Sequence, residues 1–192
     1  MIKRREYLNE LKKWKHDKVI KVITGLRRCG KSTLLSIFED ELLESGVERE
    51  QIISLNFEML EYEELKDYKK LYQYIIAHLQ PERMNYVFLD EIQMVADFQK
   101  VVDSLYIKNN VDLYITGSNA YLLSGELATL LSGRYVEINM LPLSFRDSCL
   151  YLWKHAYNLH CFCLYKGVQD TEWHQVSRLF CRLRSLPPRR RG

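Results

Sequence analysis

The sequence predicts an α/β protein, a three-layer sandwich in which helices cover both faces of a parallel sheet of about five strands. Three observations support this fold class. Short apolar runs alternate with longer segments whose apolar residues recur at helical spacing. The runs are almost continuously apolar, which is typical of parallel strands buried on both faces. A loop at residues 25–32 joins the first run to a helical segment, and right-handed crossovers would bring all strand carboxyl ends to its edge of the sheet.

The first half of the chain is expected to contain, in order, a helix over 6–15, a strand over 19–24, a helix from the loop to about 45, a strand over 51–57 and a helix over 65–79. The first helix is amphipathic, with Leu8 and Leu11 on its apolar face. We expect it to pack against the domain rather than on a membrane or on nucleic acid. Gly46 and Pro81 mark the ends of the two later helices, because neither residue continues a helix readily.

The second half continues the alternation with a strand over 85–90, a helix over about 96–109, a strand over 111–116, a helix over 119–131 and a strand over 134–139. The chain shows no internal repeat. Alternating strands and helices of this kind form parallel sheets, whose polar side chains gather where the strands end.

The loop at residues 25–32 fits the pattern G-x-x-x-x-G-K-[ST]. Gly25 and Gly30 allow a tight turn whose N–H groups converge on phosphates, and the next helix adds the positive end of its dipole. Lys31 would reach the β- and γ-phosphates, and the Ser32 hydroxyl would ligate Mg²⁺. A glycine turn without a ligand is the alternative, but the flanking strand and helix are the context that the motif requires. The predicted nucleotide-binding residues are Gly25, Leu26, Arg27, Arg28, Cys29, Gly30, Lys31, Ser32 and Thr33.

A second motif, V-F-L-D-E at residues 87–91, ends the third expected strand. Asp90 at the end of a buried strand can hold Mg²⁺, usually through water, beside the loop serine. Glu91 could orient or deprotonate an attacking water. Such a run alone is often only a solvated strand end, but one strand beyond a phosphate-binding loop it predicts a metal ligand and a catalytic base.

Polar residues also follow the fourth expected strand. Ser118 or Asn119 could reach the γ-phosphate or the water from the side opposite the helix, with Thr116 as a third candidate. The alternative is that Ser118 or Asn119 caps the next helix, and the two roles are compatible.

An arginine precedes the fifth expected strand. Arg134 could be supplied in trans to a neighbour's nucleotide, where it would stabilise transition-state charge. The alternative is a surface arginine after a helix that ends at Gly133.

Other nucleotide-using classes fit less well. A GTPase would carry an N-K-x-D motif, which the chain lacks. An ABC-type ATPase would carry L-S-G-G-Q before the strand-end aspartate, whereas L-S-G at residues 131–133 follows it and lacks the rest. A small-molecule kinase shares the loop, but the pair Asp90 and Glu91 favours water as the acceptor.

Five segments occur in one order: the loop, L-D-E-I-Q at 89–93, T-G-S-N at 116–119, L-S-G-R at 131–134 and L-P-L-S-F at 141–145. Together they resemble the prokaryotic AAA-type P-loop ATPase family. The resemblance covers residues 1–147. It implies the strand order 5-1-4-3-2 and the use of ATP rather than GTP.

The resemblance also implies ATP hydrolysis with Mg²⁺, for a remodelling or regulatory task that the sequence does not identify. It gives Lys31, Ser32, Asp90, Glu91 and Arg134 the roles argued above, and Arg134 would require a homo-oligomer. The alternative function is an ATP-binding switch or interaction protein with little or no hydrolysis.

The resemblance predicts two segments, an ATP-binding domain over 1–147 and a divergent basic, Cys- and His-rich tail over 148–192, irregular or helical. The family continues instead into a winged-helix segment and a nuclease-like domain, so we expect a truncated or frameshifted product. Cys161 and Cys163 are closer together than usual zinc ligand pairs, which argues against a zinc site.

Charge and hydropathy exclude some partners. Residues 1–150 hold 20 Lys and Arg against 23 Asp and Glu, and residues 151–192 hold 8 against 2. The main domain therefore gives no sign of a nucleic-acid surface, although the tail's arginines could touch nucleic acid. The chain has neither a membrane-length apolar run nor the apolar core of a secretory signal, so we expect no membrane partner and a cytoplasmic location.

Overall fold

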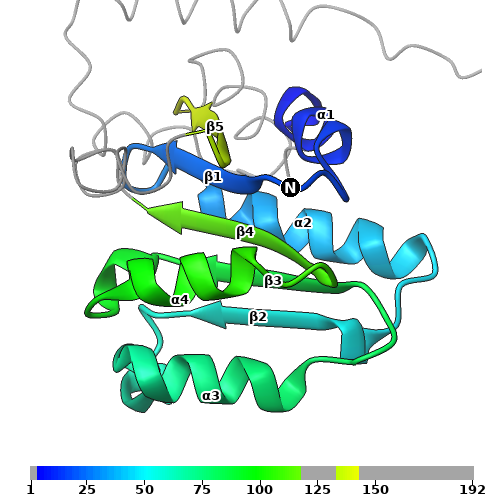
Figure 1. The fold of residues 1–192 in the computed structure, drawn as a ribbon. Coiled ribbons are helices and arrows are strands. Elements are labelled where there is room, and N and C mark those ends of the chain that lie inside the picture. The colour runs from blue at the N-terminus through cyan, green and yellow to red at the C-terminus, as the bar shows by residue number, and fades with distance from the viewer. Residues whose placement is uncertain (1–3, 118–132, 143–192) are drawn as a thin grey trace, which may run out of the picture. The chain divides into compact units, whose positions relative to one another are not determined.

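The structure is a computed structural model that describes residues 4–117 and 133–142. Its helices and strands alternate along the chain (Figure 1). They are α1 (Arg5–Lys13), β1 (Ile20–Gly25), α2 (Lys31–Glu44), β2 (Ile52–Asn56), α3 (Tyr68–His78), β3 (Asn85–Asp90), α4 (Phe98–Tyr106), β4 (Val111–Gly117) and β5 (Tyr135–Met140). Short 3₁₀ helices span Arg49–Gln51 (η1), Leu60–Lys66 (η2) and Ile92–Met94 (η3). The expected helix over 119–131 lies outside the described residues.

The five strands form one parallel sheet in the order β2-β3-β4-β1-β5. This is the expected order 5-1-4-3-2 read from the other edge, so the predicted fold is confirmed. The register places Asn56 beside Asp90 and Gly25 beside Met140. The carboxyl ends of the strands therefore meet at one edge, which is where β1 runs into the loop before α2.

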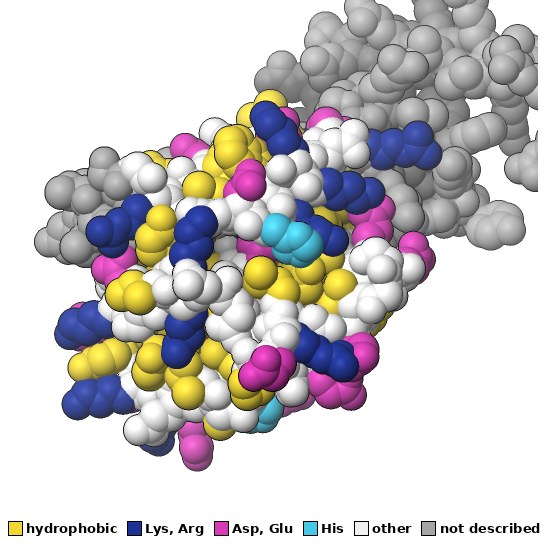
Figure 2. Space-filling model, turned by 45° about the vertical axis from the view of Figure 1, so that its right-hand side comes forward, with side chains coloured by type: hydrophobic (Ala, Val, Ile, Leu, Met, Phe, Trp, Pro, Cys, Tyr) yellow, Lys and Arg dark blue, Asp and Glu magenta, His cyan; other side chains and the backbone are white. Residues whose placement is uncertain are grey.

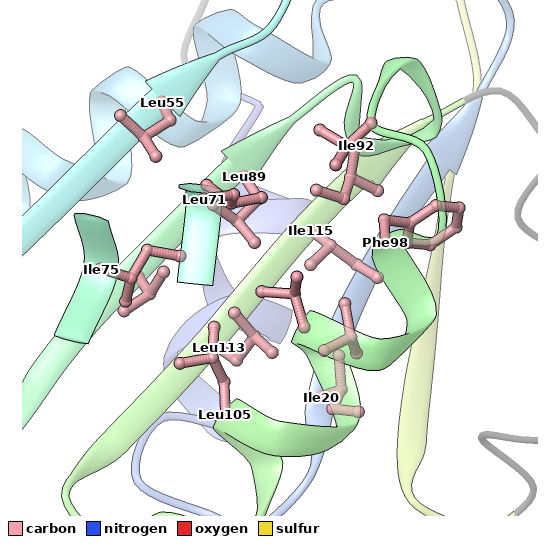
Figure 3. Packing of buried hydrophobic residues seen from close by; sticks show 14 of the residues in the cluster. Ile20, Leu55, Leu71, Ile75, Leu89, Ile92, Phe98, Leu105, Leu113 and Ile115 are labelled. Atoms are coloured by element: carbon pink, nitrogen blue, oxygen red, sulfur yellow. The ribbon is translucent and has the colours of Figure 1, made fainter. Parts of the chain in front are cut away.

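Helices α3 and α4 cover one face of the sheet. Alternate strand residues point into this layer and are buried, and Figure 3 shows how side chains from the two helices meet those from the strands. The labelled members are Ile20, Leu55, Leu71, Ile75, Leu89, Ile92, Phe98, Leu105, Leu113 and Ile115. Burying one Leu or Ile side chain stabilises the fold by about 1.5–3 kcal/mol, so this layer contributes strongly to holding β3 and β4 in the sheet.

Helices α1 and α2 cover the opposite face, through the alternate set of strand residues. Phe88 and Tyr114 stack with their ring centroids 4.8 Å apart, and Phe38 of α2 meets Tyr114 at 5.3 Å. Leu8 and Leu11, the predicted apolar face of the first helix, are buried in this layer. The expectation that α1 packs on the domain is thus confirmed.

This second layer also encloses an ion pair that sequence reasoning missed. The Lys21 side chain is fully buried, and its Nζ contacts Asp112 Oδ1 and donates to the Asp17 carbonyl oxygen at 2.9 Å. Asp112 Oδ2 accepts hydrogen bonds from the Tyr114 hydroxyl at 2.9 Å and the His16 backbone N–H at 3.0 Å. Both side chains of the pair are buried, whereas His16 and Asp17 belong to the exposed segment before β1.

Helix α3 begins three residues later than the expected 65–79 segment. Asp67 caps it, because its Oδ1 accepts the backbone N–H groups of Lys69 and Lys70, each at 3.0 Å. The residues before this cap form η2 instead. In the described parts of the chain, no helix has the length and apolar content needed to cross a bilayer.

Candidate functional site

The loop between β1 and α2 depends on two glycines. Gly25 has φ +154°, and a Cβ there would lie 2.4 Å from the Met140 carbonyl oxygen, so β5 approaches too closely for any side chain. Gly30 has φ +98°, a left-handed conformation that favours glycine. Between them Leu26 is exposed and Cys29 is buried. The first turn of α2, starting at Lys31, therefore presents its free N–H groups at the carboxyl edge of the sheet.

Lys31 is buried, with 4% of its surface exposed. Its Nζ donates to the Gly25 carbonyl oxygen at 3.5 Å and lies 3.2 Å from Glu91 Oε1. The ammonium thus folds back over the loop and uses Glu91 as its counter-ion. Two residues predicted to act on one nucleotide are in direct contact.

Asp90 ends β3 and is 5% exposed. Its Oδ2 accepts the Asn56 amide at 3.0 Å, and its Oδ1 accepts the Thr116 hydroxyl. Burial raises the pKa of this carboxyl and the charge of Glu91 adds to the rise, whereas hydrogen bonds from Ser32 and Thr116 oppose it.

Glu91 follows in a left-handed conformation with φ +55°. Its backbone N–H donates to Thr116 Oγ1 at 3.0 Å, so one threonine holds the backbone of Glu91 and the side chain of Asp90. The Gln93 amide Nε2 donates to Glu91 Oε2. Non-glycine residues in this conformation cost free energy and often mark functional sites. Here the turn lets Asp90 and Glu91, adjacent in sequence, both take part in the site.

A divalent cation fits the donors at this edge. The Ser32 hydroxyl lowers the pKa of the Asp90 carboxyl, and hard cations such as Mg²⁺ prefer oxygen ligands of these types. Burial raises the pKa of Asp90 because it disfavours the negative charge of the carboxylate. A cation bound beside it would offset this effect. These two residues could therefore hold Mg²⁺.

Arg134 lies away from this edge. It precedes β5 at the amino end of the strands, whereas Lys31 follows the carboxyl end of β1, whose six residues span about 20 Å. The Arg134 guanidinium is 3.5 Å from Asp103 and lies over the Tyr106 ring at 5.7 Å. It does not join the site of its own chain, and its action in trans stays a prediction.

The site thus combines Lys31, Ser32, Asp90 and Glu91 as the sequence suggested. Ser118 and Asn119 lie outside the described residues. Sequence reasoning missed Asn56 and Gln93 and gave Thr116 only a minor place. The signal was present for Asn56, since it is the polar end of the strand expected next to β3.

The comparisons with known proteins agree with this geometry. A family model described as an AAA domain matches residues 17–149, well over half of the chain. The chain belongs to this family. The predicted membership in an AAA-type P-loop ATPase family is therefore confirmed, and with it the general class of nucleotide-binding, ATPase-like proteins.

Two uncharacterized relatives match two thirds or more of this chain. One from Haemophilus influenzae is 50% identical over 149 residues, which is 77% of this chain and 37% of the relative. One from Methanocaldococcus jannaschii is 34% identical over 133 residues, 67% of this chain and 27% of the relative. The chain therefore spans about a third of the length of these relatives.

Three solved structures share the fold. Saccharomyces cerevisiae Hsp104, in a complex with casein, has a TM-score of 0.57 at 16% identity and covers 88% of this chain and 31% of that one. Saccharomyces cerevisiae RIF2 has 0.54 at 16%, covering 94% and 70%. Drosophila ORC bound to DNA has 0.51 at 15%, covering 76% and 94%. At these identities the likeness concerns the fold alone.

Proposed function

We propose that this AAA domain binds ATP together with Mg²⁺ and hydrolyses the γ-phosphate bond. The observation that carries the proposal is the meeting of Lys31, Asp90 and Glu91 beside the glycine loop, with Lys31 Nζ 3.2 Å from Glu91 Oε1. A buried ammonium, a buried carboxylate for a metal and a second carboxylate for water are the parts that phosphoryl transfer to water requires. Family membership supports the same reaction class.

Each residue has a separate task in this proposal. Backbone N–H groups of the loop and the Lys31 ammonium hold the negative charge of the phosphates. Ser32 and Asp90 hold Mg²⁺, which when bound neutralises charge on the phosphate oxygens. Glu91 accepts a proton from, or orients, the water that attacks in line with the leaving oxygen. Ser118 or Asn119 senses the γ-phosphate.

Charge stabilisation in the transition state would be completed by Arg134 from a neighbouring copy of this chain. Its position at the amino edge of the sheet supports action in trans, because it faces away from its own Lys31. In that case the active form is a homo-oligomer, and the contacts of Arg134 with Asp103 and Tyr106 must open first.

The task that hydrolysis drives is proposed only as remodelling or regulation. On the face shown in Figure 2, described Lys and Arg side chains lie among acidic and hydrophobic ones, so a nucleic-acid partner has no support from that face. The boundary between the domain at 1–147 and the tail at 148–192, contacts of the tail with nucleic acid, and a cytoplasmic location stay predictions from the sequence.

Isothermal titration calorimetry with ATP and Mg²⁺ tests the binding half of the proposal. Lys31→Ala should weaken ATP binding at least tenfold, since it removes the one buried cation that the described residues place at the loop. Lys12→Ala, on the exposed side of α1, is the matched control and should bind like the parent. Equal affinities for the parent and Lys31→Ala would overturn the assignment of the loop.

The Lys31–Glu91 contact also suits the alternative function, an ATP-binding switch. In such a protein Glu91 would stay with Lys31 and turnover would be slow or absent. ATP binding by the parent with no hydrolysis above that of Glu91→Gln would support the switch.

A further inference from the structure

Gln93 is the second side chain that contacts the Glu91 carboxylate. It lies in η3, and its Nε2 donates a hydrogen bond to Glu91 Oε2. The orientation of the amide follows from chemistry, because an ionised carboxylate only accepts hydrogen bonds and the amide oxygen could not replace the nitrogen there. The remaining amide atom, Oε1, is buried and has no donor among the described residues. The contact with Glu91 therefore orients this side chain.

The backbone around Gln93 is held firmly on both sides. Ile92 is fully buried in the α3/α4 layer. The Met94 N–H donates to the Glu91 carbonyl oxygen at 3.1 Å, and the Val95 N–H donates to the Ile92 carbonyl oxygen at 2.9 Å. Because η3 is anchored in this way, the Gln93 amide joins the Glu91 carboxylate to a well-packed segment of the backbone.

The two oxygens of Glu91 have different partners. Oε1 faces Lys31 Nζ at 3.2 Å, and Oε2 faces the Gln93 amide. A bound phosphate group would compete for Lys31, since it offers more negative charge than one carboxylate. It would not compete for a neutral amide that lies on the other oxygen. When the Lys31 contact is lost, the Glu91 carboxylate would therefore still be held by its hydrogen bond to the Gln93 amide.

We propose that Gln93 is a positioning residue for Glu91. Its amide holds Oε2 so that Oε1, once released by Lys31, is free to accept a hydrogen bond from water in a fixed direction. In this proposal Lys31 pairs with Oε1 while no nucleotide is bound. Gln93 keeps its hydrogen bond to Oε2 in both states and so fixes the orientation of the carboxylate. This inference rests on the proposed role of Glu91 in hydrolysis.

Single-turnover hydrolysis by the full chain, combined with ATP calorimetry, tests the role. Gln93→Met keeps the length of the side chain and removes the donor. We expect its hydrolysis rate constant to fall about 10- to 100-fold while the Kd for ATP stays within about twofold. Gln99→Met in α4 is the matched control and should behave like the parent. If Gln93 only packs, the methionine should replace it without loss of rate. A hydrolysis rate constant for Gln93→Met within twofold of the parent would therefore overturn the inference.

A second measurement does not need hydrolysis. The side-chain amide resonances of Gln93 are identified by NMR from their loss in Gln93→Met. They should shift strongly in Glu91→Ala, which removes the acceptor, and shift much less when Mg²⁺ and a non-hydrolysable ATP analogue are added, because the hydrogen bond to Oε2 is kept. A parent chain that binds ATP without turnover would overturn the proposed hydrolysis. The resonances would then still test whether Gln93 is hydrogen-bonded to Glu91. Gln93 resonances that do not respond to Glu91→Ala would contradict it.

Discussion

Substitution of Lys21 by methionine should be one of the most damaging single changes far from the loop. The Lys21 ammonium is buried between β1 and β4, and it is the cation that pairs with Asp112. In Lys21→Met the Asp112 carboxylate would stay buried with only two neutral donors, the Tyr114 hydroxyl and the His16 N–H. Burial raises the pKa of Tyr114, so its hydroxyl keeps its proton and remains a neutral donor.

The magnitude follows from the burial of both partners. Breaking a buried pair by removing one partner costs about 3–5 kcal/mol, which is a large part of the roughly 5–15 kcal/mol that stabilises a domain. With a urea m-value near 2 kcal/mol/M, the unfolding midpoint should fall by about 1.5–2.5 M. The double variant Lys21→Met/Asp112→Asn should recover part of this loss, because the asparagine is neutral and keeps an acceptor oxygen for Tyr114.

Urea unfolding monitored by circular dichroism measures these midpoints. Lys12→Met is the control, since Lys12 forms a half-exposed pair with Glu41 at 2.9 Å and such pairs contribute about 0–1 kcal/mol. The reasoning is refuted if Lys21→Met loses no more stability than Lys12→Met. It is also refuted if the double variant is less stable than Lys21→Met.

Three further predictions concern the loop, the site and α2. Gly25→Ala should abolish ATP binding in calorimetry and lower the melting temperature, because its Cβ would lie 2.4 Å from the Met140 carbonyl oxygen. Thr116→Val keeps the shape of the side chain but removes the hydrogen bonds to Asp90 and the Glu91 N–H; we expect about a tenfold loss of single-turnover rate. Burial raises the pKa of Glu39, so the free energy of unfolding should fall as pH rises through that pKa, and Glu39→Gln should be more stable than the parent at pH 7 and show a smaller pH slope in urea titrations.

Each of these predictions has a contrary outcome. ATP binding by Gly25→Ala at parent affinity would mean that β5 does not approach the loop as described. A parent-like rate for Thr116→Val would remove the threonine from the positioning of the two acids. A parent whose stability does not change across that pH range, or a Glu39→Gln variant less stable than the parent, would contradict the burial argument.

The fold was predictable from the sequence because its signals are periodic and local. Apolar strands alternating with helices indicate a parallel sheet, and the loop at residues 25–32 locates the edge where polar groups gather. The first residue of α3 was less predictable. Asp67 caps this helix through hydrogen bonds from the N–H groups of Lys69 and Lys70, which apolar spacing does not reveal.

The site was predictable only in part. Lys31 and Asp90 follow from motifs in which each position has a chemical reason. The partners that orient them come from other strands, so their pairing depends on register: Asn56 meets Asp90 only because β2 lies next to β3. Gln93 reaches Glu91 because of a left-handed turn, which no propensity predicts for glutamate.

The buried pair escaped sequence reasoning for a similar reason. Lys21 and Asp112 are each a single charge inside an apolar run, and either residue alone would be read as a strand position that faces solvent. Only the parallel pairing of β1 and β4 brings them within reach of each other. Long-range register is thus the information that the motifs and the periodicity lack.

The proposal that Glu91 acts on water in ATP hydrolysis is tested most directly by single-turnover hydrolysis of ATP with Mg²⁺ by the full chain and by Glu91→Gln. The glutamine keeps the size of the side chain and removes its ability to accept a proton. The account predicts that both proteins bind ATP and that the hydrolysis rate constant of the variant is lower by a factor of about 100 or more. Equal rates in the two proteins would contradict it.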